Sequence, residues 1–588
     1  MVLSLTLAFA SNNGVKAIEV GSDIYNAVKS LYISQHHALP STTGPWSENE
    51  VKLMLSRLQR EELTPSEKDT YDYVLSQIQH EDDIFKFNLN ANLEVYGHTN
   101  PSDFTSRAKW TEDTKPMVEI QTDSWIGDNF YGLFTINIAN AKIMAGGDNI
   151  DKFASTALST NLIMVPPASM KTLDFGFPHN AYIAAGGENW NLMWGKYNLS
   201  WGPGKTGNFI IGDHLESHDN IKLTAFNNTF KYTFLIDSFP HPMNYYNSDP
   251  NQGHVGYNGD LGLSSQERLQ GLKLMLSHRL EWRLFDDVLN IALTEGLMYM
   301  DENNMINLSI LNPSMLWHNL YTRGHSNSIL ALEADWSIIK GLNIYGSIVV
   351  DENILPGEPV PGKAGEDPAE PSAMGYMLGI TYTRPLERGI LEINAEGVFT
   401  DPFLYLRDGG FAPGTENYRT QKKGQYGINY VVALRDIYNT GGGVRYTEEY
   451  LGYKYGGDAI VGNFSVDYKE YGKWNVGGNI FFMAHGTFDQ WTVWTRINPD
   501  KDHQYYPIEN PTTPTTSHVT ENQRDDNVGE RNEVEFTLDF TLKGGYKILQ
   551  NLEAYISSDF IFVKNLGNIS SPDLKTDIQL TLGLSYEI

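Results

Sequence analysis

Residues 578–588 read Ile-Gln-Leu-Thr-Leu-Gly-Leu-Ser-Tyr-Glu-Ile, an uninterrupted alternation of apolar and polar side chains. Because successive side chains of a β-strand point to opposite faces, this pattern predicts a strand with one apolar and one polar face. Two kinds of protein contain such a strand. It can be the half-buried edge of a soluble β-sandwich, or the strand that closes a transmembrane β-barrel.

The composition of the whole chain favours the barrel. The 588 residues carry a formal net charge of −29 and contain no cysteine, and the mean hydropathy is −0.36. A spanning helix needs about 18 consecutive apolar residues, which the chain lacks, whereas a barrel strand needs an apolar residue only at every second position. The acidic balance argues against nucleic acid as a partner, and the absence of cysteine excludes disulfides and thiolate metal sites.

The first residues have features of an export signal. Residues 2–10 (VLSLTLAFA) form a short apolar run, and Ala8-Phe9-Ala10 or Val15-Lys16-Ala17 could be the cleavage site. The run lacks the positively charged segment that normally precedes it. We therefore interpret residues 1–17 as the remnant of a signal peptide.

Residues 18–80 predict a module of short helices. Ser47 and Glu50 have the spacing of a capping box, and Thr64, Pro65 and Glu67 mark the start of a further helix. We expect this module to cover the periplasmic end of the barrel. Binding to peptidoglycan or to a partner protein is the alternative role.

From residue 83 to residue 588 the pattern becomes one of alternating strands. Four clear examples are residues 330–336, 391–399, 474–482 and 534–542, in which apolar residues alternate with polar ones that include repeated Asp and Glu. Carboxylates at such positions are costly in a packed core but suit a water-filled lumen. We predict a mainly β fold, a transmembrane antiparallel barrel of about 18 strands with an N-terminal helical module.

Three connections are long and polar, namely residues 240–262, 355–372 and 489–532. Outer-membrane barrels keep their periplasmic turns short and place their long loops outside the cell. We therefore expect a recognition surface to lie in loops of this kind.

The loop 489–532 combines aromatic rings with carboxylates, a combination that suits sugars because ring faces contact C–H groups and carboxylates bind hydroxyls. The candidate glycan-binding residues are Trp491, Trp494, Asp500, Asp502, Tyr505 and Tyr506. The alternative is that these rings anchor the protein at the membrane interface.

The same loop contains a weak calcium motif. Its candidate ligands are Asn498, Asp500, Asp502 and Glu509, spaced as in an EF-hand loop. The glycine that such a loop requires is replaced by His503. A solvated acidic loop is the simpler interpretation, and we predict no metal or other cofactor.

The motifs of common hydrolases and nucleotide-binding enzymes do not occur. An outer-membrane phospholipase would place His and Ser two residues apart on one strand face, and the chain has no His-x-Ser sequence. HExxH, P-loop and GxSxG motifs are also missing. We predict that the protein is not an enzyme.

A family resemblance begins at Trp201-Gly202-Pro203-Gly204. Together with residues 208–213, this segment resembles the turn and following strand of the bacterial capsule-assembly Wzi family. Further segments agree in the same order along nearly the whole chain: residues 278–281, 294–295, 311–313, 350–352, 401–405 and 451–459. From the residues themselves, Trp201–Gly204 is interpreted as a structural turn set by glycine and proline, not as a binding site.

The resemblance implies an outer-membrane barrel of a diderm bacterium with a periplasmic helical bundle. It also implies a non-catalytic, lectin-like surface protein that binds and helps attach or organise capsular or extracellular polysaccharide. The other expected partners are outer-membrane lipid and the barrel insertion machinery. Residues 581–588 resemble the C-terminal signal that this machinery recognises. A diffusion porin or transporter, and an adhesin or structural surface protein, are the alternative functions, and the oligomeric state cannot be predicted.

Overall fold

The computed structural model describes most of the chain. The described residues are 13–79, 84–104, 107, 114–140, 157–162, 173–176, 179–239, 272–301, 305–320, 326–352, 372–406, 429–438, 443–488, 490, 494–495, 506–507 and 531–588. Among these residues, no helix combines the length and the apolar character needed to cross a membrane.

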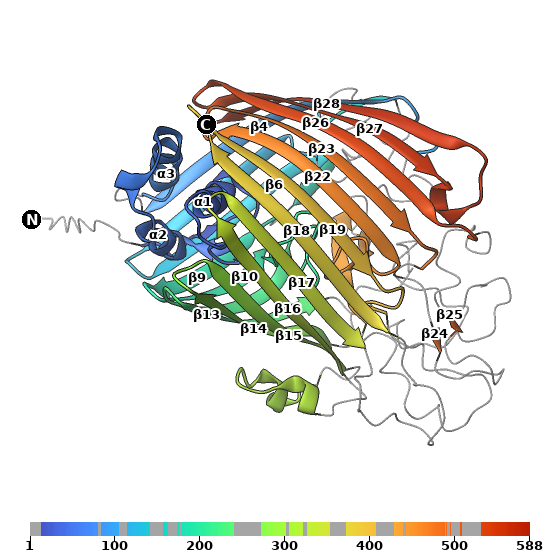
Figure 1. The fold of residues 1–588 in the computed structure, drawn as a ribbon, viewed down its shortest axis with the longest axis horizontal. Coiled ribbons are helices and arrows are strands. Elements are labelled where there is room, and N and C mark those ends of the chain that lie inside the picture. Colours follow the sequence, from blue (N-terminus) through green and yellow to red (C-terminus); the bar gives the residue numbers. More distant parts are fainter. Residues whose placement is uncertain are drawn as a thin grey trace, which may run out of the picture.

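Strands of the described residues form a closed antiparallel barrel of 18 strands, as predicted (Figure 1). Two positions in the barrel are each occupied by two strands. β5 and short β7 pair with successive parts of β4, and β8 and β9 pair with successive parts of β6. The barrel strands are β4 (Phe85–His98), β5 (Val118–Ile126), β6 (Phe130–Asn140), β7 (Leu158–Thr160), β8 (Leu173–Gly176), β9 (Ala181–Gly187), β10 (Trp190–Tyr197), β12 (His218–Phe226), β13 (Phe230–Phe239), β14 (Leu272–Leu284), β15 (Leu289–Asp301), β16 (Ser326–Ile339), β17 (Leu342–Glu352), β18 (Ala373–Pro385), β19 (Ile390–Thr400), β22 (Ala459–Glu470), β23 (Trp474–His485), β26 (Glu535–Leu549), β27 (Leu552–Lys564) and β28 (Leu574–Glu587).

The C-terminal strand closes the barrel against the first one. β28 pairs antiparallel with β4, with Leu580 opposite Gly97 and Glu587 opposite Asn90. The alternate residues from Ile578 to Tyr586 face outward and are 38–46% exposed, while Gln579 faces the lumen and is buried. This arrangement confirms the predicted alternation. An exposed row of apolar side chains of this kind is typical of a barrel surface in contact with lipid.

The two ends of the barrel differ. The turns that join β9 to β10, β12 to β13, β16 to β17, β18 to β19, β22 to β23 and β26 to β27 are short and lie at one end, here called the inner end. Outward-facing aromatic residues lie within the last few positions of the strands at that end: Trp190, Trp282, Trp336, Tyr382, Trp474, Tyr546 and Tyr586. A ring of this kind is typical of a membrane interface. The long connections start from the strand ends at the opposite, outer end.

The helical module forms as predicted and lies at the inner end (Figure 1). Its helices are α1 (Asp23–Ser34), α2 (Glu48–Ser56) and α3 (Pro65–Gln77). The capping boxes of Ser47 with Glu50 and of Thr64 with Glu67 are both present, and Pro65 occupies the first turn of α3. These caps bond backbone N–H groups that would otherwise lack partners, which fixes where α2 and α3 begin.

The predicted signal segment lies partly outside the described residues, which begin at Asn13. Of the two candidate cleavage sites, the one at residues 15–17 belongs to a segment that packs on the barrel. Val15 is fully buried, and Lys16 Nζ lies 2.7 Å from the Asp123 carboxylate. Cleavage at that site would remove these contacts, and the signal peptide itself stays a prediction.

Several small elements complete the described fold. Two-stranded pairs join β1 (Ala17–Ile18) to β3 (Trp46–Ser47), β2 (Thr43–Gly44) to β11 (Ser200–Trp201), β20 (Val431–Tyr438) to β21 (Gly443–Tyr450), and β24 (Trp494–Thr495) to β25 (Tyr506–Pro507). Short 3₁₀ helices are η1 (Arg60–Glu62), η5 (Leu308–Leu311), η6 (Trp317–Leu320) and η10 (Leu566–Asn568).

The outward face of β28 can be tested with one pair of substitutions. Leu582→Lys should destabilise the folded barrel by about 2–4 kcal/mol, because it places a charge on the lipid-facing surface near mid-membrane. Thr581→Lys, one residue earlier, directs the same charge into the lumen and should change stability little. Urea titrations of the barrel in lipid vesicles measure both values; equal losses would show that the two faces are wrongly assigned.

Candidate functional site

The connection between β10 and β12 folds into the lumen instead of leaving the barrel. We call residues 198–217 the lumen loop. Gly202 has a φ of +144°, a conformation that side-chain-bearing residues rarely adopt. Asn208 holds the turn closed because its Oδ1 accepts from Gly204 N–H at 2.9 Å and its Nδ2 donates to Ser200 Oγ at 2.9 Å. The Trp201–Gly204 motif therefore shapes the loop, and the Trp201 ring is fully buried.

One carboxylate of the barrel wall binds the tip of the lumen loop. Glu396 on β19 accepts from the backbone N–H groups of Lys205 and Thr206 at 2.8 and 2.9 Å, and from the Thr206 hydroxyl at 2.6 Å. Tyr345 on β17 donates its hydroxyl to the same carboxylate at 2.7 Å. Glu396 faces the lumen, as the alternation predicted, but it is buried under protein and not in contact with water.

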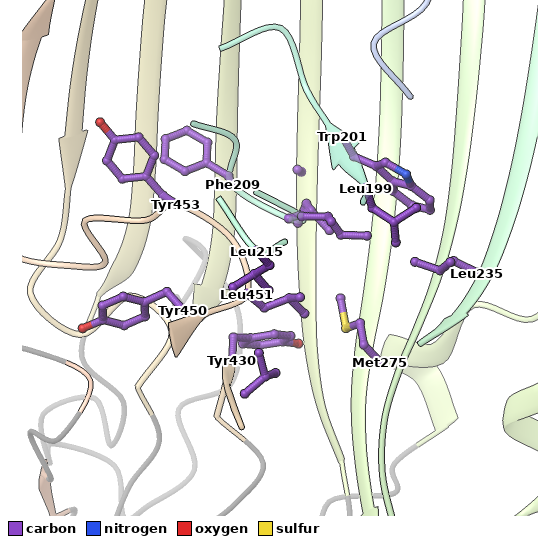
Figure 2. Packing of buried hydrophobic residues seen from close by; sticks show 14 of the residues in the cluster. Leu199, Trp201, Phe209, Leu215, Leu235, Met275, Tyr430, Tyr450, Leu451 and Tyr453 are labelled. Carbon is purple, nitrogen blue, oxygen red and sulfur yellow. The ribbon is translucent and has the colours of Figure 1, made fainter. Parts of the chain in front are cut away.

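An apolar cluster joins the lumen loop to segments from the outer end (Figure 2). The Phe209 and Tyr453 rings lie 5.7 Å apart. The Tyr405 hydroxyl donates to the Phe209 carbonyl at 2.6 Å and accepts from Tyr453 N–H at 3.0 Å, and Gly212 N–H donates to the Leu451 carbonyl at 2.8 Å. Segments 198–217, 401–406 and 450–457 thus form one packed body inside the barrel.

The other half of the lumen is partly wet and is closed toward the outer end. On β26 the Lys543 side chain faces inward beside Asp467, at 3.4 Å, and is 55% exposed, so water reaches this part of the lumen. Nearer the outer end, buried Glu94 accepts from the Tyr555 hydroxyl at 2.6 Å and from Lys115 N–H at 2.8 Å. Folded-in chain therefore covers the lumen side of Glu94.

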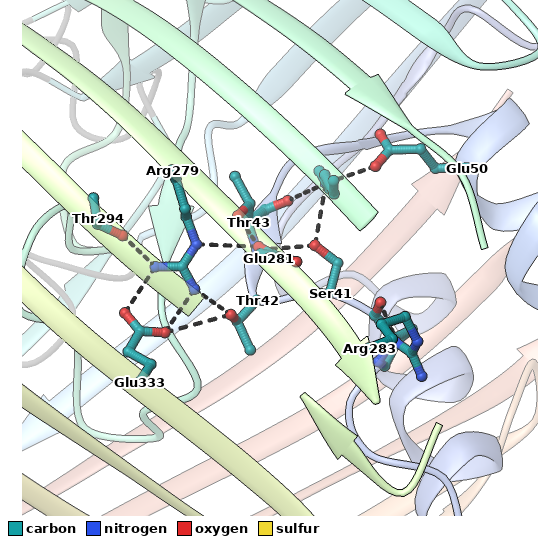
Figure 3. Close-up of polar contacts among 11 residues, drawn as sticks. Ser41, Thr42, Thr43, Glu50, Arg279, Glu281, Arg283, Thr294 and Glu333 are labelled. Atoms are coloured by element: carbon teal, nitrogen blue, oxygen red, sulfur yellow. Dashed lines mark hydrogen bonds and ion pairs between the residues drawn. The ribbon is translucent and has the colours of Figure 1, made fainter. Parts of the chain in front are cut away.

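The linker before α2 is held to the wall by a buried network of charges (Figure 3). Arg279 on β14 donates to Glu333 at 2.6 and 2.9 Å, to Glu281 at 3.1 Å and to Thr294 at 2.7 Å. Linker hydroxyls of Thr42 and Thr43 complete the network by bonding Arg279 and Glu281. Every charge has an opposite partner, which such deep burial requires.

A second set of contacts fixes the helical module itself. Lys231 on β13 lies 2.6 Å from the Glu50 carboxylate of α2 and donates to Ser41 Oγ at 3.1 Å. In the linker, burial lowers the pKa of His37 to about 4, and the nearby Arg283 and Arg57 act in the same direction. The His37 ring is therefore neutral at physiological pH and adds no charge to this junction.

Most of the predicted glycan and calcium residues lie outside the part of the chain that the structure describes. Trp491, Asn498, Asp500, Asp502, Tyr505 and Glu509 lie outside the described residues. The backbone of Trp494 pairs with that of Pro507, and Thr495 pairs with Tyr506, so β24 and β25 join the two ends of the predicted site. In the described part of the chain, no group of three or more His, Cys, Asp or Glu side chains is arranged to hold a metal ion.

The sequence alone did not reveal the partners of the lumen loop. The Trp201–Gly204 motif marked a turn, but nothing in the pattern near Glu396 or Arg279 distinguishes these residues from other lumen-facing charges. The available signal was the alternation, which places both side chains inside the barrel.

Comparison with known proteins supports the fold. No protein-family model and no curated protein sequence matches the chain. Among solved structures, Wzi of Escherichia coli, described as an outer-membrane protein involved in group 1 capsule assembly and a carbohydrate-binding β-barrel, is similar with a TM-score of 0.53 and 12% identity over 97% of this chain and 98% of that one. OprD of Pseudomonas aeruginosa is matched with a TM-score of 0.37 and 9% identity over 86% and 95% of the two chains, too weakly to bear on function. The chain has the fold of a large outer-membrane barrel.

The role of Gly202 can be separated from general effects of glycine replacement. Gly202→Ala should destabilise the protein by about 1–3 kcal/mol, because the residue has a strained φ and a Cβ would lie 2.2 Å from Asn208 Oδ1. Gly397→Ala is the control, since no atom lies within 4 Å of a Cβ there. Chemical denaturation of both variants gives the comparison; equal stability would contradict the structural role of the motif.

The charge network predicts a large effect of one truncation. Arg279→Met removes the ion-pair partner of buried Glu281 and Glu333 and should cost about 3–5 kcal/mol. It should also make the linker at residues 38–45 more accessible to protease. Arg60→Ala breaks a pair whose side chains are 45% and 48% exposed, so it should have little effect. Similar protease sensitivity in both variants would argue against the network as the anchor of the module.

Proposed function

We propose that this protein is a member of the Wzi family that binds capsular or extracellular polysaccharide at the surface of a diderm bacterium. In this proposal it resides in the outer membrane, with the inner end of the barrel and the helical module in the periplasm. It attaches or organises the polysaccharide and does not turn it over.

The observation that carries the proposal is that the chain itself fills part of the lumen. Glu396 binds the lumen loop, and the Arg279 network binds the linker. Two folded segments therefore occupy the lumen. A barrel filled in this way is a rigid support for its outer loops. This favours recognition at the outer surface over passage through the lumen.

The chemistry of the loop between β23 and β26 suits a sugar polymer. It combines Trp491, Trp494 and Tyr505–Tyr506 with the carboxylates of Asp500 and Asp502. Aromatic faces and carboxylates together bind the C–H and hydroxyl groups of a sugar. The loop leaves the outer end, where an exported polysaccharide is available. The similarity of the fold to a barrel described as carbohydrate-binding adds support.

Two other functions predict different measurements. A porin would use the same barrel, but the packed lumen loop and the buried Glu94 region count against an open path. An adhesin would use the same outer loops for a foreign surface and would not bind the polysaccharide of its own cell. Binding to the cell's own polysaccharide therefore separates the proposal from both alternatives.

The proposed binding loop can be tested with a double variant. Trp491→Ala with Trp494→Ala should weaken binding to the producing cell's own polysaccharide by at least about tenfold in Kd, or ~1.4 kcal/mol. Trp336→Ala removes a ring at the inner end that is 52% exposed and should leave the affinity unchanged. Surface plasmon resonance with the refolded barrel and an unrelated glycan as reference gives the affinities.

Heat-modifiable migration on gels verifies that each variant is folded. Wild-type protein that does not bind the polysaccharide would contradict the proposed function. Wild-type binding that persists unchanged in the double variant would contradict only the assignment to this loop.

A further inference from the structure

The lipid-facing rows of two neighbouring strands are interrupted at the same place. The outward residues of β14 are Leu272, Leu274, Leu276, His278, Leu280, Trp282 and Leu284, and those of β15 are Leu289, Ile291, Leu293, Glu295, Leu297, Tyr299 and Asp301. His278 and Glu295 lie directly opposite each other in the register. A carboxylate and an imidazole are costly where a barrel faces lipid.

A folded segment on the outside of the wall covers this pair. His278 Nε2 lies 2.8 Å from Glu295 Oε2. The Trp317 ring stacks on the His278 ring at 4.4 Å, and the backbone N–H groups of Trp317 and His318 donate to Glu295 at 3.2 and 2.7 Å. The pair is thus fully bonded and shielded from lipid.

We call residues 305–320 the wall flap. It lies outside the barrel beside β14 and β15 (Figure 1). The hydroxyls of outward-facing Tyr232 and Tyr299 donate to the carbonyls of Pro313 and Met305 at 2.6 and 2.8 Å, and Ile310 and Trp317 are buried against the wall. The barrel surface here is built to hold protein, not lipid.

The free face of the wall flap is unsuited to both water and lipid. Met305, Leu308 and Leu316 are 67%, 77% and 62% exposed, which is costly in water. Between them, Asn312 and Ser314 are also exposed, which is costly in hydrocarbon. A mixture of apolar and uncharged polar groups is typical of a protein–protein interface.

The depth of the wall flap supports the same conclusion. His278 lies four residues beyond Trp282 of the inner aromatic ring, or about 10 Å along the barrel axis at the usual rise and tilt of a barrel strand. The apolar band of an outer-membrane barrel is about 25 Å tall. Part of the wall flap therefore lies within the hydrocarbon, where irregular chain is tolerated only under cover of protein.

The charge of the wall flap fits a second copy of the same chain. Residues 305–320 contain no Asp, Glu, Lys or Arg, although the chain carries a net charge of −29. A strongly acidic chain can approach its own copy without repulsion only through an uncharged face. We propose that the wall flap is the contact surface of a homodimer in the membrane, in which the flap of each copy covers the flap of the other.

Cysteine cross-linking tests the dimer cleanly because the natural chain has no cysteine. Single variants Leu308→Cys and Leu316→Cys, treated in native outer membranes with a short bismaleimide, should give a cross-linked species of twice the chain mass. Ile556→Cys on β27 is the matched control; this lipid-facing residue is 47% exposed and lies on the opposite side of the barrel. It should give no such species.

A second measurement covers the possibility that cysteine at these positions disturbs the flap. Native mass spectrometry of the unaltered protein should show a dimer, and Leu308→Asn with Leu316→Asn should convert it to monomers that remain heat-modifiable. A monomeric natural protein, cross-linking to a protein of another mass, or equal cross-linking at Ile556→Cys would overturn the proposal.

Discussion

The structure depends on one constraint, the absence of water as a hydrogen-bonding partner inside a membrane. Each backbone N–H and C=O group in the spanning part must bond to the chain itself, which a sheet achieves only by closing. The pairing of β28 with β4 provides that closure. It also requires a strict alternation, because one face of every strand meets lipid while the other meets the lumen. The apolar row from Ile578 to Tyr586 follows directly from this requirement.

The same constraint has consequences inside the barrel. A lumen this wide would be filled by water unless the chain occupies it, and the protein uses the lumen loop and the linker to do so. The tip of the lumen loop is held by the buried wall carboxylate Glu396, and the linker hydroxyls bond the buried wall pair Arg279 and Glu281. The loop and the linker therefore have to make these bonds as they cover the wall, since a charge that is buried without a partner is costly. On the outside of the barrel, the wall flap likewise covers His278 and Glu295 and bonds to the Glu295 carboxylate.

Much of the fold could be predicted because its signals are local. Alternation over residues 578–588 indicated the barrel, and the caps at Ser47 and Thr64 indicated the starts of two helices. The Trp201–Gly204 turn was visible because glycine and proline restrict the backbone within a few residues.

What connects these parts could not be predicted, because it depends on pairs far apart in the chain. The bond from Thr206 to Glu396 spans 190 residues, and no local pattern distinguishes Glu396 from other inward carboxylates. The wall flap was missed for the same reason: His278 and Glu295 interrupt apolar rows, but only the register shows that they meet. The predicted glycan residues, apart from the backbone of Trp494 and Tyr506, lie outside the described residues and stay a prediction.

The central claim is that this barrel supports its outer loops and does not conduct. The most direct test is the conductance of single purified barrels in a planar lipid bilayer in concentrated KCl. The account predicts no stable step in current, since the lumen loop and the Glu94 region close the path. A steady, voltage-independent conductance from each inserted barrel would contradict it and would make the protein a porin.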